Sequence, residues 1–377
     1  MEDKQKEVDF IMNKKFFLEK KEIACTFINI IIVKMFFTYP RIMVTNSGNA
    51  AWMQMLYVSL VCFGIFLIVD FLNRNNEMEN IFDISEKVGG KILRIIIGSV
   101  ILLVLLTNLS ENIRIFPESI RTVILPNTPT KFIMFLFIGA ISIGAYMGIY
   151  SICRIHSLFI PIIGLVMIFF FLVLLPDIDL NNIFPLSGTG VYNVFVKGLR
   201  GISVFSDMMI IYIILPFCKN RRDIKTSISY SFLISGIAAA VMLLIYVLVY
   251  PYPISREFIL PAYQLARIAK IGSYFQRFEA FFEFAWSIAM MLYAAFYLFV
   301  ICYTFTETFK TKYYTEVIMP IVLLSAGLGF VPMNFVTFLG DAEIAARIVY
   351  PILFLIPAGV GVIYSIKLKR RERRKKK

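Results

Sequence analysis

The chain has 377 residues, of which 59% are hydrophobic, 15% aromatic and 17% charged, and its mean hydropathy is +0.77. Soluble domains contain about 45–50% apolar residues. The charges here are grouped between apolar runs of about 18 residues or more, each long enough to cross about 30 Å of hydrocarbon. This composition excludes a soluble catalytic domain and predicts an all-α integral membrane protein.

Ten apolar runs, taken in chain order, predict about ten transmembrane helices. We expect residues 1–22 to form a cytoplasmic N-terminal tail, 23–366 a polytopic transmembrane domain and 367–377 a basic cytoplasmic tail. The first 22 residues lack the apolar core and cleavage site of a signal peptide, so the first helix should remain in the mature protein. The predicted spans are 23–39, 50–72, 92–113, 130–148, 155–175, 191–217, 227–249, 278–304, 315–331 and 344–366.

The distribution of Lys and Arg predicts that both termini are cytoplasmic. Basic residues gather in the two tails and in 73–91 and 219–225, whereas 176–190 and 331–341 contain none. Nine of the last eleven residues are Lys or Arg, so the tail should lie on anionic lipid. No aromatic residue interleaves this run, which argues against nucleic-acid binding despite the net charge of +13.

The outer loop 250–277 is the exception to this charge rule. Its stretch 261–270 begins with Pro and has apolar residues at helical spacing, which predicts a short amphipathic helix on the outer surface. A solvated connector is the alternative. The five Cys residues are scattered singly, and the single His156 is expected in a short basic loop. The sequence therefore predicts no metal site, no cofactor and no His-based catalytic triad.

Two of the predicted spans contain features that interrupt a simple helix. Lys34 lies in the first, ahead of Pro40, and Asp207 lies in the sixth, among glycines and serines. We expect Lys34 and Asp207 to pair, because an unpaired charge in the membrane is costly. Lys197 and Arg200 lie nearer the start of the sixth span and are expected to snorkel toward the interface.

Spans one and six are the first members of two sets of five. Matched interruptions at these places are typical of an inverted-repeat transporter of the LeuT type, with discontinuous helices 1 and 6 and a site near the bilayer midplane. The alternative is a pair of ordinary kinks joined by one buried ion pair. A polytopic membrane enzyme would need carboxylates or histidines clustered at one interface, and the sequence has no such cluster.

Several short motifs resemble the B subunit of bacterial spore germination receptors, in the order found in that family. They span nearly the whole chain. The motifs are Tyr39-Pro40-Arg41, Asn49-Ala50-Ala51-Trp52, Arg114-Ile115-Phe116, Leu125-Pro126-Asn127-Thr128-Pro129, Asn181 to Leu186, Lys197-Gly198, Ser203 to Asp207, Leu215-Pro216-Phe217 and Arg277-Phe278-Glu279 with Trp286.

This resemblance implies a fold and a function. The family is similar to the amino acid–polyamine–organocation transporters and shares their five-plus-five inverted repeat. It implies a receptor subunit of the spore inner membrane that binds a small germinant, commonly an amino acid. Its partners would be a membrane-embedded A subunit and a lipoprotein C subunit. This chain departs from many members at Val33-Lys34-Met35, where they have a glycine-containing stretch.

We expect a small zwitterion to bind between the breaks of the first and sixth helices. Backbone N–H groups near Ser206 suit its carboxylate, and Asp207 or Glu111 suits its ammonium. The predicted ligand-binding residues are Lys34, Thr38, Asn108, Glu111, Phe205, Ser206, Asp207 and Phe282. The alternative function is a secondary permease for amino acids or related metabolites, with Glu111, Asp207, Glu279 and Glu283 as candidates for ion coupling.

Overall fold

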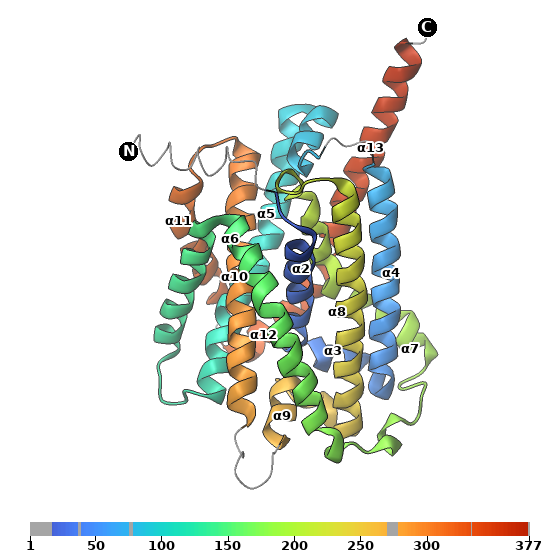
Figure 1. Cartoon of the computed structure of the whole chain (residues 1–377), viewed down its shortest axis with the longest axis vertical. Helices are drawn as coiled ribbons and strands as arrows, with labels where there is room; N and C mark the ends of the chain where they lie inside the picture. The colour runs from blue at the N-terminus through green and yellow to red at the C-terminus, as the bar shows by residue number, and fades with distance from the viewer. Residues whose placement is uncertain (1–16, 37–38, 75–77, 270–277, 333, 376–377) are drawn as a thin grey trace.

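The computed structural model describes residues 17–36, 39–74, 78–269, 278–332 and 334–375 (Figure 1). Regular structure in these ranges is helical, apart from one isolated bridge between Leu18 and Cys218. The helices are α2 (Lys20–Met35), α3 (Tyr39–Ser47), α4 (Ala51–Leu72), α5 (Ile81–Val123), α6 (Thr130–Val173), α7 (Val191–Phe195), the 3₁₀ helix η4 (Lys197–Tyr212), α8 (Arg221–Val249), α9 (Pro261–Ile268), α10 (Phe278–Phe309), α11 (Tyr314–Gly329), α12 (Phe335–Ile348) and α13 (Ile352–Lys375).

Within the described ranges, six helical segments are long and apolar enough to cross a membrane, and α11 is a shorter apolar helix. The predicted all-α membrane fold is therefore confirmed. The ten predicted spans exceed these six segments by four, because α6 contains two of them and because α2, η4 and α11 have 16 residues each. The long segments are Tyr39–Leu72, Ile81–Val123, Thr130–Val173, Arg221–Val249, Glu279–Phe309 and Thr337–Leu368.

A single glycine divides α6 into two arms. Gly148 has φ 81° and ψ 170°, a conformation that glycine adopts readily, and the chain turns back there (Figure 1). The second arm begins directly after Gly148, whereas a loop was expected around His156. That expectation is wrong: His156 is buried in the helix, with its Nδ1 2.8 Å from the carbonyl oxygen of Ile152. Arg154 also lies in the helix, and its charge is paired there: its Nε lies 3.4 Å from Glu22 Oε1 on α2.

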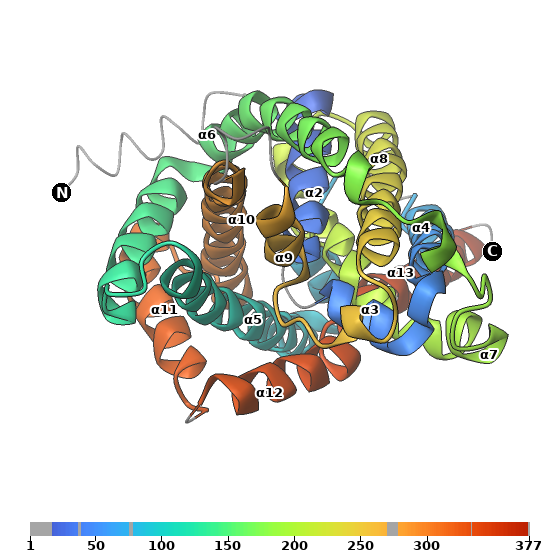
Figure 2. The same cartoon turned by 90° about the horizontal axis from the view of Figure 1, so that it is seen from below.

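The helix α10 lies at the centre of the bundle. It packs against α5 and α6, and 78% of its most apolar window is buried. The corresponding window of α6 is only 22% buried, and α6 lies at the periphery (Figures 1 and 2). The exposed side chains of α6 are mostly apolar and suit contact with lipid. The helix α2 lies between α6 and α8 and packs against both (Figure 2).

The first predicted span is broken, as expected. The helix α2 ends at Met35, and α3 begins at Tyr39 with Pro40 as its second residue, where a missing N–H costs no helical hydrogen bond. The sixth span is irregular in another way, since it is wound as a 3₁₀ helix over Lys197–Tyr212 with no gap near Ser206. Runs of this length are uncommon. Gln54 of α4 supports the winding by donating to the carbonyl of Gly198 at 3.0 Å.

Two further predicted elements, the amphipathic helix after residue 260 and the last span, are present in the structure. The predicted amphipathic helix after residue 260 is present as α9, and its buried Ala262 and Leu265 pack on the bundle, so it is not a solvated connector. The predicted span 344–366 is two helices, because Val349, Tyr350 and Pro351 separate α12 from α13. A proline disfavours helix at the residue before it, which accounts for the break. The helix α12 then packs against η4.

Candidate ligand-binding pocket

Lys34 and Asp207 join the first and sixth spans. The Lys34 Nζ lies 2.7 Å from Asp207 Oδ2, and the two side chains are 4% and 0% exposed. The predicted pairing is confirmed. A buried ion pair is stable only when further hydrogen bonds satisfy both groups. Here the Nζ also donates to the carbonyl oxygens of Ser203 and Val204, at 3.3 and 3.2 Å, on the turn of η4 that precedes Asp207.

Aromatic rings complete the surroundings of the Lys34 ammonium. The ring centroids of Tyr39 and Tyr350 lie 5.8 and 5.9 Å from its Nζ. These distances allow cation–π attraction from two sides. Tyr39 opens α3, and Tyr350 lies in the break between α12 and α13. The breaks of the first and last spans and the 3₁₀ helix of the sixth therefore meet at one buried ammonium.

A small cavity lies beside this ammonium. Its volume is about 30 Å³, enough for about two water molecules. Three predicted site residues line it: Lys34, Asn108 and Glu111. Sequence reasoning missed most of the others. The full lining is Lys34, Tyr39, Ile42, Asn108, Glu111, Asn112, Ile115, Tyr293, Ala342, Glu343, Ala346 and Tyr350. We call this cavity the deep pocket.

One wall of the deep pocket is fixed by hydrogen bonds. The Oδ1 of Asn108 accepts from the Tyr293 hydroxyl at 2.9 Å and from Asn112 Nδ2 at 2.8 Å. Glu111 is half-buried on the same helix and lies within electrostatic range of Lys34 and Asp207. Lys34 is matched by Asp207, and Glu343 is ion-paired with Arg347, so among the described residues that line the pocket the Glu111 carboxylate is the charge left without an ion-pair partner.

The other predicted site residues that the structure describes lie outside this lining. Ser206 uses its hydroxyl within η4, donating to the carbonyl of Ser203 at 2.8 Å and to Asp207 Oδ1 at 3.2 Å. Phe205 stacks on Phe232 of α8, with centroids 5.6 Å apart. Phe282 lines a separate cavity of about 10 Å³ beside Phe36 and Glu283. Thr38 falls outside the described residues.

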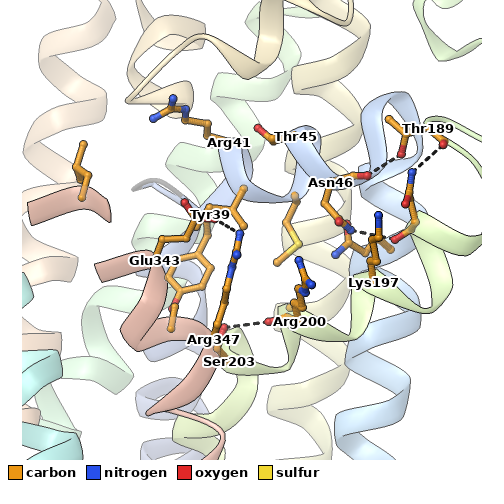
Figure 3. Close-up of a pocket in the computed structure, with 17 residues that line it drawn as sticks. Tyr39, Arg41, Thr45, Asn46, Thr189, Lys197, Arg200, Ser203, Glu343 and Arg347 are labelled. Atoms are coloured by element: carbon orange, nitrogen blue, oxygen red, sulfur yellow. Dashed lines mark hydrogen bonds and ion pairs between the residues drawn. The ribbon is translucent and has the colours of Figure 1, made fainter. Parts of the chain in front are cut away.

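A larger cavity adjoins the deep pocket in the half of the molecule that holds α3 and α7 (Figures 1 and 3). Its volume is about 400 Å³, and we call it the vestibule. Tyr39, Ile42, Glu343 and Ala346 line both cavities, so these side chains separate them. The vestibule is also lined by Arg41, Met43, Thr45, Asn46, Gln54, Thr189, Asn193, Lys197, Arg200, Gly201, Ser203, Leu339 and Arg347.

Several neutral polar groups of the vestibule are hydrogen-bonded within the protein. Thr189 donates through its hydroxyl to the carbonyl of Asn46 at 2.6 Å, and Asn46 donates through its amide to the carbonyl of Asn193 at 3.0 Å (Figure 3). These bonds hold α3 against α7 and the loop before it. They form a fixed wall, since the Thr189 hydroxyl and the Asn46 amide already have protein partners.

The family model described as "Spore germination protein" matches residues 18–333. Spore germination protein B2 of Bacillus subtilis (strain 168) is 21% identical over 252 residues, which cover 66% of this chain and 68% of that protein. Spore germination protein YndE of the same organism is 25% identical over 278 residues, covering 71% and 74%.

Among solved structures, the chain is similar to Mhp1, a nucleobase-cation-symport-1 family transporter in a closed conformation with bromovinylhydantoin bound. The match has a TM-score of 0.61 and 11% identity and covers 86% of this chain and 75% of Mhp1. At this identity the likeness concerns the fold, which is that of a transporter. The family model covers most of the chain and supplies the relationship, and the protein belongs to the spore germination protein family of permease-like membrane proteins.

Proposed function

We propose that this protein is a germinant-receptor subunit that binds a small zwitterion, an amino acid or close analogue, in the deep pocket. Family and fold point to a permease-like protein rather than an enzyme. The supporting observation is the Glu111 carboxylate, which has no ion-pair partner among the described residues and lies beside the buried Lys34–Asp207 pair, where two broken spans meet the 3₁₀ helix η4. A ligand ammonium would supply the missing positive charge. The rings of Tyr39 and Tyr350 would supply apolar contact and further attraction for a cation.

Ligand entry requires a second conformation. About 30 Å³ does not hold an amino acid, and the vestibule beside it holds about 400 Å³. Movement of Tyr39 or α12, which line both cavities, would join them. A ligand that binds the joined form better shifts the population toward it. That shift is the signal which the A and C subunits would receive.

A sensor of this kind needs no coupling ion. Moving a two-state equilibrium from 1:99 to 99:1 takes about 5.5 kcal/mol of differential binding. Charge-assisted hydrogen bonds of about 1.5–3 kcal/mol each can provide it. Lys34 would also repel a sodium ion at the break of the first helix.

The permease alternative has specific support. The fold is that of a cation symporter, and Glu111 and the buried Glu283 are carboxylates that could take part in ion coupling. Proteoliposomes of the full chain separate the two functions. We expect saturable ligand binding but no concentrative uptake driven by a proton or sodium gradient. In cells, germination should also require the A subunit. Gradient-driven uptake by the chain alone would establish the permease.

We also propose that the protein lies in the spore inner membrane with both termini cytoplasmic. The vestibule then opens outward, and the basic tail lies on anionic lipid. Single-cysteine variants of two exposed residues test this orientation, Ser187→Cys near α7 and Lys225→Cys on α8. A membrane-impermeant thiol reagent applied from outside should label only Ser187→Cys. Equal labelling, or labelling of Lys225→Cys alone, would overturn the orientation.

A further inference from the structure

The vestibule collects positive charge. Arg41 comes from α3, Lys197 and Arg200 from η4, and Arg347 from α12, and Glu343 is the single carboxylate among the described residues of the lining. The lining thus carries a net of three positive charges. Arg347 is ion-paired with Glu343, so one cation is matched within the cavity (Figure 3). In the expected orientation this cluster lies on the side of the membrane that Lys and Arg usually avoid.

Two of the remaining cations have protein partners, and one does not. Arg41 donates through its Nε to the carbonyl of Arg256 at 3.1 Å. The Lys197 Nζ lies 5.7 Å from the ring centroid of Tyr192. Within the described part of the chain, the guanidinium of Arg200 has no ion pair or hydrogen bond, and it points into the cavity (Figure 3). Arg200 therefore offers its planar set of N–H donors to whatever enters.

We infer that the vestibule binds the side-chain carboxylate of an anionic amino acid through Arg200. An arginine guanidinium matches a carboxylate through two parallel hydrogen bonds. A concave site lined by one sign of charge also raises the local concentration of the opposite ion. The unmatched Glu111 in the deep pocket would repel a simple dianion but attract the ammonium of an amino acid. The two cavities together therefore favour a ligand of the aspartate or glutamate type over its neutral amide.

This inference rests on the proposed function, which makes the ligand an amino acid. One arm of its test therefore measures the charge of the vestibule without any amino acid. Thr45 is an exposed lining residue of α3, and the five native cysteines are all buried. Thr45→Cys in the full-length protein is labelled with thiosulfonate reagents of equal size and opposite charge. We expect the anionic reagent to react about tenfold faster. The control is Ser187→Cys, which is exposed outside the vestibule and should show a ratio near one.

The second arm uses protection of Thr45→Cys by matched pairs, aspartate against asparagine and glutamate against glutamine. The acid should protect at about tenfold lower concentration than its amide. Arg200→Gln should remove both this preference and most of the reagent-charge ratio. Arg200→Lys should keep the ratio but weaken the preference, because an ammonium lacks the planar set of donors.

The outcomes separate the two ideas. Equal reagent rates, or an amide that protects as well as its acid, would overturn the anionic ligand while leaving the proposed function intact. Protection by neither acid nor amide would also overturn it. If in addition no amino acid binds the intact protein by calorimetry, the proposed function fails independently.

Discussion

The deep pocket and the vestibule share a wall, but their charged side chains differ in burial and in pairing. At the deep pocket, the lining residue Lys34 and its partner Asp207 are almost fully buried, and the ammonium is bound by a carboxylate and two carbonyls. In the vestibule, the side chains of the Arg347–Glu343 pair are 45% and 39% exposed, and the guanidinium of Arg200 has no ion pair or hydrogen bond among the described residues. Charges interact far more strongly away from water. The deep charges therefore hold the fold, while the vestibule charges remain available to a ligand.

The largest expected effect is at the buried pair. Lys34→Met or Asp207→Asn leaves one buried group without its partner and should cost about 3–5 kcal/mol of folding free energy. The double change should cost less than the sum, since it leaves no unmatched charge. Thermal unfolding in detergent, followed by size-exclusion chromatography, measures both effects.

The matched control for this prediction is Lys310→Met. The Lys310 Nζ lies 2.7 Å from Asp83 Oδ1, as in the buried pair, but the side chains are 42% and 35% exposed. Lys310→Met should therefore cost no more than about 1 kcal/mol. Equal losses at Lys34 and Lys310 would remove burial as the cause of the difference.

A smaller effect on stability is expected at Glu111, which lies near the buried pair and would contact the proposed ligand. Glu111→Gln keeps the shape and removes the charge, so stability should change little. Ligand affinity should fall by about 10–100-fold, because one charge-assisted hydrogen bond is lost. Calorimetry measures the affinity. The control is Glu118→Gln on the same helix, outside the lining of both cavities, and an equal loss there would argue against the deep pocket as the site.

The smallest effect on stability is expected at the exposed pair of the vestibule. Glu343→Gln and Arg347→Gln should each change the free energy of unfolding by no more than about 1 kcal/mol, because water screens this pair. The same thermal assay applies. A loss as large as that of Lys34→Met would mean that the vestibule, too, is held together by its charges.

The part of the site that could be predicted from the sequence is the buried ion pair, because leaving a charge unpaired inside the membrane costs free energy in any protein. A buried lysine and a buried aspartate each need a partner of opposite charge. The contact between Lys34 and Asp207 could therefore be predicted although they are far apart in sequence. The spans were predicted for the same kind of reason, since the bilayer requires long apolar helices. Glu111 and Asn108 were also expected near the site and do line the deep pocket.

The other residues of the two cavities are brought there by helix packing, and the type of a residue does not reveal how its helix packs. Tyr293 and Tyr350 were missed because a tyrosine in an apolar span reads as core or as a membrane-interface residue. Pro351 was a usable signal for the break before α13, but the apolar run continues past it. Arg200 was expected to snorkel toward the membrane interface, and its place in a cavity whose other walls come from α3 and α12 could not be predicted from its span alone. Phe282 was expected at the site and lines another cavity.

The wall shared by the two cavities has a thermodynamic consequence. Glu343 and Ala346 of α12 line both, so a molecule in either cavity contacts the same helix. If occupancy of the vestibule alters the position of α12, it alters the affinity of the deep pocket, and linkage requires the reverse effect to be equal in size. A compound that fits only the vestibule would then be an effector of this protein, able to raise or lower its response without entering the deep pocket.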